Sequence, residues 1–220
     1  MKLQWSYSSL KTFLQCPKKY YHLKVARDIQ DSPGEAANYG KIVHKAAEDY
    51  IRDAVPVPEK FAYVRPILDA LNRIEGEKFC EIEMGIKIVD GVHVACDFDD
   101  PDYWWHGIAD LLVVKGEVGY LVDYKTNKNA RYADTKQLDL LAVAAFLRYP
   151  ELQKIKSALL FVVSNDFINK EHHRDNFLKY LDPMRFDLER LEKAFEHDVW
   201  NPVSGPLCKF CPVKSCIHNS

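Results

Sequence analysis

Residues 79–124 carry a hydrophobic pattern with a period of two, which predicts four consecutive β-strands. Apolar and polar residues alternate in 79–89 and in 92–98, and Asp90-Gly91 stands between these runs. Two more strand-like runs, 104–114 and 118–124, flank a turn at Lys115-Gly116-Glu117. An Asp-Gly pair between alternating runs favours a tight hairpin. The segment therefore predicts an antiparallel meander against which the rest of the chain must pack.

The sequence on both sides of this meander is mainly helical. Apolar residues at positions i, i+3, i+4, i+7 and i+8 predict an amphipathic helix over 39–53. Ser8 or Ser9 suits the N-cap of a first helix, and Asp182-Pro183 suits the start of the last one. The remaining predicted elements are helices at 8–24 (bent by Pro17), 60–74, 134–148 and about 183–199, and strands at 157–163 and 167–178. We predict an α/β fold, with a mixed central sheet flanked by helices.

Length and composition set the broad class of the protein. A chain of 220 residues with 47% hydrophobic and 28% charged residues fits one globular domain. It has no run of 18 apolar residues and no signal-peptide core near its N-terminus, so we expect a cytoplasmic protein without a membrane partner. The net charge of −2 neither indicates nor excludes binding to nucleic acid.

Acidic residues near the ends of two predicted strands suggest a cation site. Asp123 and Lys125, in L-V-D-Y-K-T, lie two residues apart and so share one face of a strand. Asp110 interrupts the apolar run I-A-D-L-L-V-V on the preceding strand, where an unpaired charge is costly. Neighbouring strands are about 4.8 Å apart, so Asp110 and Asp123 can share one Mg²⁺ or Mn²⁺ ion. Taken alone, an Asp-x-Lys sequence is more often an ordinary surface ion pair.

Two more polar residues can complete this site. Gln137 begins the predicted helix that follows the strand of Asp123 and can reach back to the strand end. His44 borders the apolar stripe of the 39–53 helix, and imidazole is a good ligand for Mn²⁺. A lone histidine at such a place is more often a residue of the helix flank than a ligand.

The cysteines divide into two kinds. Cys208, Cys211 and Cys216 cluster in a short segment rich in Pro, and Cys16 can supply a fourth thiolate from the other end of the chain. Four thiolates fit either a 4Fe–4S cluster or tetrahedral Zn²⁺. Such a metal would join the N- and C-terminal segments and act mainly to stabilise the fold. Cys80 and Cys96 fit small core residues.

The order of these motifs resembles the RecB-like branch of the PD-(D/E)XK nuclease superfamily. The likeness rests on G-K-I-V-H, G-I-A-D, L-V-D-Y-K-T and a helical Gln, in that order. The opening S-Y-S-S-L-K-T-F-L-Q-C-P-K-K-Y-Y and the ending G-P-L-C-K-F-C-P-V-K-S-C resemble its iron–sulfur members, which include AddB-type nuclease domains and CRISPR-associated RecB-like exonucleases. This resemblance implies a restriction-endonuclease-like fold and favours a 4Fe–4S cluster over zinc.

The resemblance also implies roles for single residues. His44, Asp110, Asp123 and the backbone carbonyl of Tyr124 would bind the metal, Lys125 would be the catalytic lysine, and Gln137 would orient the site or touch DNA. Leu141 departs from the pattern, since the family often has Tyr there, so that contact is not carried over.

We therefore predict a single Mg²⁺- or Mn²⁺-dependent nuclease domain over 1–220. Its core would be 39–200, with cluster-binding segments at 8–24 and 201–220. The resemblance implies an exonuclease acting on single-stranded DNA ends, in recombination, repair or DNA processing. The chain lacks a G-x-x-x-x-G-K-[ST] loop, so a helicase motor would be a separate partner. The alternatives are a non-catalytic nucleic-acid-binding scaffold or partner subunit, and an iron–sulfur or zinc redox protein.

Overall fold

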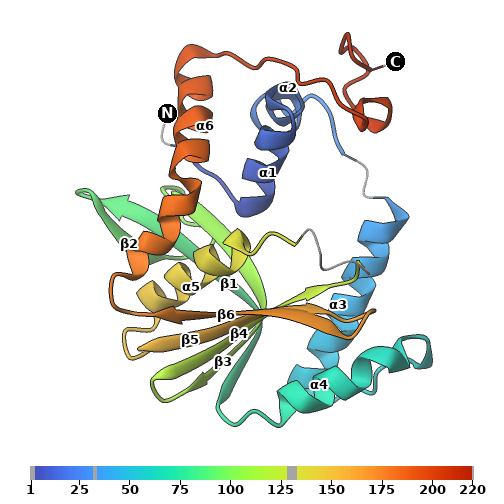
Figure 1. Cartoon of the computed structure of the whole chain (residues 1–220), viewed down its shortest axis with the longest axis vertical. Coiled ribbons are helices and arrows are strands. Elements are labelled where there is room, and N and C mark those ends of the chain that lie inside the picture. The colour runs from blue at the N-terminus through green and yellow to red at the C-terminus, as the bar shows by residue number, and fades with distance from the viewer. Residues whose placement is uncertain (1–2, 32–33, 128–132, 220) are drawn as a thin grey trace. The chain divides into compact units, whose positions relative to one another are not determined.

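The computed structural model describes residues 3–31, 34–127 and 133–219 (Figure 1). The chain divides into two compact units. Gly34–Asp182 form the unit that we call the sheet unit, and Met1–Pro33 with Pro183–Ser220 form the terminal unit. The assignment of 1–220 to one functional domain stays a prediction.

The sheet unit is built on six strands in the order β2-β1-β3-β4-β5-β6. Neighbouring strands are antiparallel except β4 and β5, which are parallel because helix α5 provides the crossover between them. The predicted mixed α/β sheet is therefore confirmed. The strands are β1 (Glu77–Val89), β2 (Val92–Cys96), β3 (Trp105–Lys115), β4 (Val118–Lys125), β5 (Lys154–Phe161) and β6 (Asp166–His173).

Helices cover both faces of this sheet (Figure 1). On one side, α3 (Glu35–Asp53), the 3₁₀ helix η2 (Glu59–Val64) and α4 (Arg65–Asn72) pack on alternate residues of β3 and β4. On the other side lies α5 (Lys136–Arg148), which is buried on every side from Leu138 to Phe146. A helix that is apolar all round belongs in a protein interior. From these two faces, His44 of α3 and Gln137 of α5 both reach residues at the end of β4 or beside it.

The sheet divides beside the predicted cation site. β3 and β4 pair from Lys115↔Val118 only as far as Leu111↔Val122. Beyond that point β3 continues with β1 as its partner, and β4 continues with β5. Asp110 and Asp123 are the first residues past the division. We call this place the fork.

The terminal unit is held together by aromatic side chains. It contains α1 (Tyr7–Gln15), α2 (Pro17–Tyr20), the π-helical turn η1 (Tyr21–Val25), α6 (Arg185–His197) and the short 3₁₀ helix η4 (Cys208–Phe210). Tyr20 stacks on Trp200 with ring centroids 5.7 Å apart, and the edges of Phe13 and Phe195 also meet Trp200. These contacts join the N-terminal helices to α6 and to the segment that follows it.

Several predicted helix starts are wrong. The N-cap of α1 is Ser6, in a capping box with Ser9, instead of Ser8 or Ser9. Pro183 lies inside a 3₁₀ helix, η3 (Phe177–Met184), and α6 begins at Arg185, so Asp182 is not its N-cap. Helix α3 begins four residues before the predicted start at 39. Local capping patterns do not show which of several polar residues a folded chain will use.

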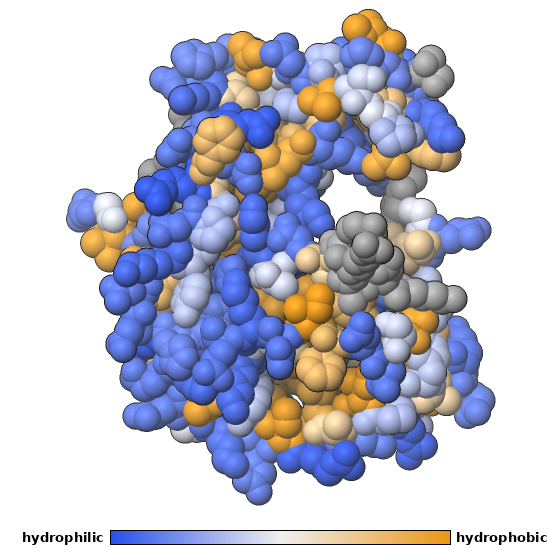
Figure 2. All heavy atoms as spheres, in the orientation of Figure 1, coloured by the Kyte–Doolittle hydropathy of each residue, from blue (hydrophilic) through white to orange (hydrophobic). Residues whose placement is uncertain are grey.

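On the face seen in Figure 2, hydrophilic side chains predominate, and apolar side chains gather in several patches between them. No helix in the described ranges combines the length and apolar character needed to cross a bilayer.

Candidate functional site

Strand register brings three carboxylates to one level of the sheet at the fork. Cys80 pairs with Leu111 and Ile82 with Ala109, so Glu81 lies opposite Asp110. The last β3–β4 pair is Leu111↔Val122, so Asp123 lies on the other side of Asp110. Asp110 and Asp123 are only 8% and 5% exposed. A row of acidic side chains at a partly dehydrated place favours a bound cation.

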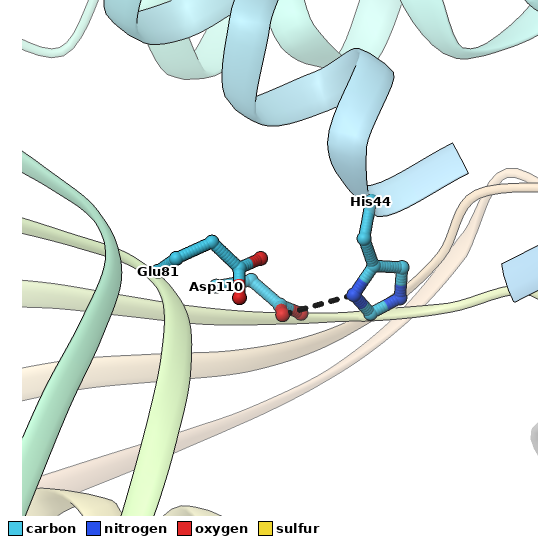
Figure 3. A group of neighbouring side chains, drawn as sticks. All are labelled: His44, Glu81 and Asp110. Carbon is cyan, nitrogen blue, oxygen red and sulfur yellow. Dashed lines mark hydrogen bonds and ion pairs between the residues drawn. The ribbon is translucent and has the colours of Figure 1, made fainter. Parts of the chain in front are cut away.

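Asp110 is held by two different elements. Its Oδ1 lies 3.0 Å from Nδ1 of His44, which points from α3 toward the carboxylates (Figure 3). Its Oδ2 accepts a hydrogen bond from the backbone N–H of Tyr124. Strand β4 no longer pairs with β3 at this position, so the Tyr124 N–H has no β3 carbonyl to bind. It donates to the Asp110 side chain instead. Division of the sheet thus fixes the orientation of Asp110.

Close approach of α3 to the end of β4 explains a glycine in the middle of that helix. A Cβ atom on Gly40 would lie 3.3 Å from Oγ1 of Thr126, just after β4. Glycine in a helix interior costs roughly 0.5–1 kcal/mol relative to alanine. Here it allows α3 to bring His44 to the fork.

Asp123, Lys125 and Gln137 form a closed triangle beside Asp110. Lys125 Nζ lies 2.5 Å from Asp123 Oδ2 and donates to Gln137 Oε1 at 3.1 Å. The Gln137 amide in turn donates to Asp123 Oδ1 at 2.7 Å. The helical glutamine therefore holds the aspartate and the lysine in one arrangement. The structure brings together His44, Asp110, Asp123, Lys125 and Gln137, and their individual roles stay predictions.

The electrostatics of the fork reflect an excess of negative charge. Burial and the neighbouring Asp110 raise the pKa of Asp123 to about 6, although Lys125 and His44 act against this. Burial and Asp110 also raise the pKa of Glu81 to about 7. Burial lowers the pKa of His44, but its hydrogen bond to Asp110 and the nearby carboxylates raise it above the ordinary value overall. The carboxylates of Glu81, Asp110 and Asp123 thus lie close together with too few positive charges nearby to balance them.

Glu81 is a site residue that the sequence did not reveal. One ligand atom from each of His44, Glu81 and Asp110 lies within 4.8 Å of the other two. Glu81 also has a φ of 50°, in the left-handed region that non-glycine residues seldom occupy. Backbone strain of this kind tends to occur at functional sites. In the sequence Glu81 is one of several acidic residues alternating along 79–89, and only the strand register distinguishes it.

A buried polar network anchors the helix that carries Gln137. Asp139, two residues further along α5, lies 2.8 Å from Nε2 of His172 and 2.6 Å from Nζ of Lys170, both on β6. The other ring nitrogen of His172 lies 3.4 Å from Oγ of Ser157 on β5. Asp139, His172 and Ser157 are almost completely buried, so this network has no access for a substrate. It fixes the first turn of α5 against the sheet.

Four cysteines of the terminal unit surround one cavity. Cys16, Cys208, Cys211 and Cys216 line a space of about 390 Å³. The backbone N–H of Val203 donates to Cys16 Sγ at 3.4 Å, and that of Gly205 donates to Cys208 Sγ at 3.3 Å. Such donors stabilise thiolates, which are the form that binds metals. Cys80 packs beside the α3–α4 core and Cys96 is half-buried on β2, and neither lines this cavity.

Comparisons with known proteins agree with the superfamily that the motifs suggest. The family model of the PD-(D/E)XK nuclease superfamily matches residues 4–85, which include His44 and Glu81. The solved structure of SSO0001 covers 100% of this chain and 89% of its own, with a TM-score of 0.51 and 13% identity. A protein from Eubacterium rectale named "Putative exonuclease" covers 99% of this chain and 87% of its own, with a TM-score of 0.52 and 14% identity.

These matches show which features this chain shares with known proteins. At such low identity the two structures show the fold alone. The comparison with curated proteins found no match. The similarity to the PD-(D/E)XK nuclease superfamily found by the family model is limited to residues 4–85, and Asp110, Asp123 and Lys125 lie beyond it.

Proposed function

We propose that this protein is a metal-dependent deoxyribonuclease of the RecB-like branch, an exonuclease that hydrolyses DNA from single-stranded ends. The observation that carries the proposal is the fork, where Glu81, Asp110 and Asp123 meet beside one lysine. The match of residues 4–85 to the superfamily model supports it, as does the fold shared with the protein named "Putative exonuclease". The preference for single-stranded ends rests on the motif resemblance.

The donor atoms at the fork fit a hard divalent cation. Asp123 Oδ2 is buried and, beyond its ion pair with Lys125, accepts no hydrogen bond within the described part of the chain. Carboxylate oxygens with one imidazole suit Mg²⁺ or Mn²⁺. Asp110, Asp123, His44 and the Tyr124 carbonyl would hold the ion. The ion would act as a Lewis acid on the phosphate and make water more acidic.

The side chains of the chain itself contribute position and charge. Lys125 brings a fixed positive charge to the place where the phosphate gains negative charge in the transition state. Gln137 keeps the lysine and Asp123 aligned through its two hydrogen bonds. The Asp139 network prevents α5, and therefore Gln137, from shifting. Preorganisation of this kind lowers the barrier because little rearrangement is left for the reaction step.

For the cysteine cavity we propose a 4Fe–4S cluster with a structural role, bound by Cys16, Cys208, Cys211 and Cys216. Zinc with four thiolates at about 2.3 Å requires sulfur atoms roughly 3.8 Å apart. Among the described residues, the cysteines form no group of three sulfur atoms within 4.8 Å of one another. The four cysteines line one cavity of about 390 Å³, and the motif resemblance favours a cluster over a single zinc ion there. We also propose that the protein is cytoplasmic and that a helicase or recombination protein is a separate partner.

The test is degradation of end-labelled DNA by anaerobically purified protein with Mn²⁺. We expect the wild type to shorten single-stranded DNA, and EDTA or Asp123→Asn to remove this activity. Asp99→Asn, at an exposed aspartate on the loop after β2, is the matched control and should leave the rate unchanged. Circular dichroism checks that each variant is folded. If folded, metal-loaded wild-type protein binds DNA without shortening it, the non-catalytic scaffold replaces the nuclease.

A further inference from the structure

Two hollows lie side by side on α3, and two lysines belong to both. The first hollow, of about 440 Å³, contains the metal-ligand candidates His44 and Glu81. The second, of about 380 Å³, lies toward η2. Lys41 and Lys45 line both, so they form the ridge between the candidate catalytic site and the second hollow.

The second hollow combines apolar walls with positive charge. Ile42 and Val55 line it while remaining 49% and 47% exposed, which leaves large apolar side chains in water. Pro56 and Pro58 make its rim stiff, because proline fixes φ. Three lysines and one aspartate lie in its lining, and the aspartate is already paired with Lys45 at 2.8 Å. Apolar walls with lysines beside them suit a ligand that has a flat apolar ring and a negatively charged group next to that ring.

Two of these lysines are available to an anion. Lys45 contacts Glu48 and Asp49, whereas Lys41 and Lys60 have no acidic partner within ion-pair distance among the residues that the structure describes. Lys60 Nζ lies 4.9 Å from the ring centroid of Phe61, at the wall of the hollow. The free cations therefore stand on the ridge and on the far rim, with the apolar walls between them.

We propose that the second hollow is a base-binding subsite for single-stranded DNA. A strand with its scissile phosphate at the fork would cross the ridge at Lys41 and place the base of a nearby nucleotide between Ile42 and Val55. Lys60 would then face the next phosphate. The inference rests on the proposed nuclease function and adds to it a reason for strand selectivity. A base in a duplex must first be unpaired and unstacked to enter a hollow, which costs free energy, whereas an unpaired base enters without that cost.

Binding measured without metal tests the subsite separately from catalysis. We would compare wild type with the double variant Ile42→Ser/Lys60→Ala, using fluorescence anisotropy of a labelled oligothymidylate in EDTA at about 0.1 M salt. Both side chains are exposed, so the fold should remain intact. Loss of a base contact and a phosphate contact should weaken binding about tenfold or more. The control Val92→Ser/Lys115→Ala removes the same kinds of exposed side chain at hairpin turns and should bind like wild type.

A small substrate separates the two proposals. Thymidine 5′-(p-nitrophenyl phosphate) has one nucleotide and cannot fill both the fork and the subsite, so the Ile42→Ser/Lys60→Ala variant should hydrolyse it with Mn²⁺ within about twofold of wild type. If wild type hydrolyses neither this ester nor DNA, the nuclease proposal fails, while the anisotropy result still decides the subsite. Equal oligothymidylate affinity of wild type and variant would overturn the subsite. An equal loss of affinity for a blunt duplex would also overturn it, because the effect would then be one of general charge.

Discussion

The fork and the cysteine cavity are both candidate metal centres, but the protein builds them in opposite ways. At the fork the proposed ligands stand on strands and on α3. Hydrogen bonds hold them in place, one between His44 and Asp110 and one from Gln137 of α5 to Asp123. In the cavity three of the four cysteines stand on a segment whose only regular structure is the three-residue helix η4. The first site is organised by strands and a helix, whereas the second segment is held by loop contacts, such as the two hydrogen bonds that the Asn219 side chain donates to the carbonyls of Cys211 and Val213. We therefore expect metal loss to change activity at the fork and stability at the cavity.

Removing one cysteine ligand should have the largest effect. Cys211→Ser should abolish metal binding in the terminal unit and open 201–219 to protease, because binding of a structural metal contributes on the order of 10 kcal/mol to folding. Iron and zinc analysis with limited proteolysis measures both effects. Cys96→Ser, which changes a half-buried cysteine outside the cavity, should keep the wild-type metal content. Full metal content in Cys211→Ser would show that the cavity does not need this ligand.

Lys125→Ala should produce the next largest effect, confined to the fork. We expect kcat to fall about 10²- to 10³-fold with little change in KM, because a charge aimed at the transition state is lost. Steady-state kinetics on single-stranded DNA measures this. The control Lys156→Ala changes an exposed lysine on β5 and should leave kcat near the wild-type value. An unchanged kcat in Lys125→Ala would remove the lysine from the reaction.

Gln137 should matter less than Lys125, since it acts by alignment. Gln137→Ala leaves the 2.5 Å contact between Lys125 and Asp123 and should lower kcat about tenfold. Gln137→Glu places a carboxylate against Asp123 Oδ1, where the amide now donates, and should lower kcat further than alanine does. The ranking of these two rates is the measurement. A glutamate variant as active as wild type would contradict the alignment role.

The smallest effect concerns the stability of the metal-free protein. The pKa of Glu81 is raised to about 7 in the folded state, whereas it is about 4.3 in the unfolded state. Its contribution to the stability of the folded state is therefore fully present below about pH 4.3 and is lost as the pH rises to about 7. Glu81→Gln should therefore stabilise the protein in EDTA at pH 8, by about 1 kcal/mol after solvent screening, and have little effect at pH 4. Thermal unfolding at both pH values measures this, with the exposed Glu83→Gln as control. A lower Tm for Glu81→Gln at pH 8 would contradict charge crowding at the fork.

The sequence could predict the parts of the site that depend on local pattern. Asp123 and Lys125 share a face because they lie two apart in an alternating run, and Asp110 stands out because its neighbours are apolar. The mixed sheet followed from the same alternation and from the helix between β4 and β5. These features need only the periods of helix and strand.

Features that depend on how strands meet could not be predicted in this way. Glu81 enters the site through its register with Asp110, and one residue of slip would turn it to the other face. His172 lies in the mainly polar run 167–178, yet it is completely buried and contacts Asp139 and Ser157 on α5 and β5. The start of α6 at Arg185 likewise depends on a 3₁₀ turn that absorbs Pro183. For Glu81 and His172 the deciding contact is distant in sequence, whereas for α6 it is a local turn that the Asp182-Pro183 pattern does not reveal.

The most direct test of the account is anomalous diffraction from crystals grown anaerobically with Mn²⁺, measured at the manganese and the iron edges. We predict manganese bound to Asp110 and Asp123 at the fork, and iron among Cys16, Cys208, Cys211 and Cys216. Full-occupancy manganese elsewhere, with the fork carboxylates contacting only Lys125, Gln137 and His44, would contradict the claim that the fork is the catalytic metal centre.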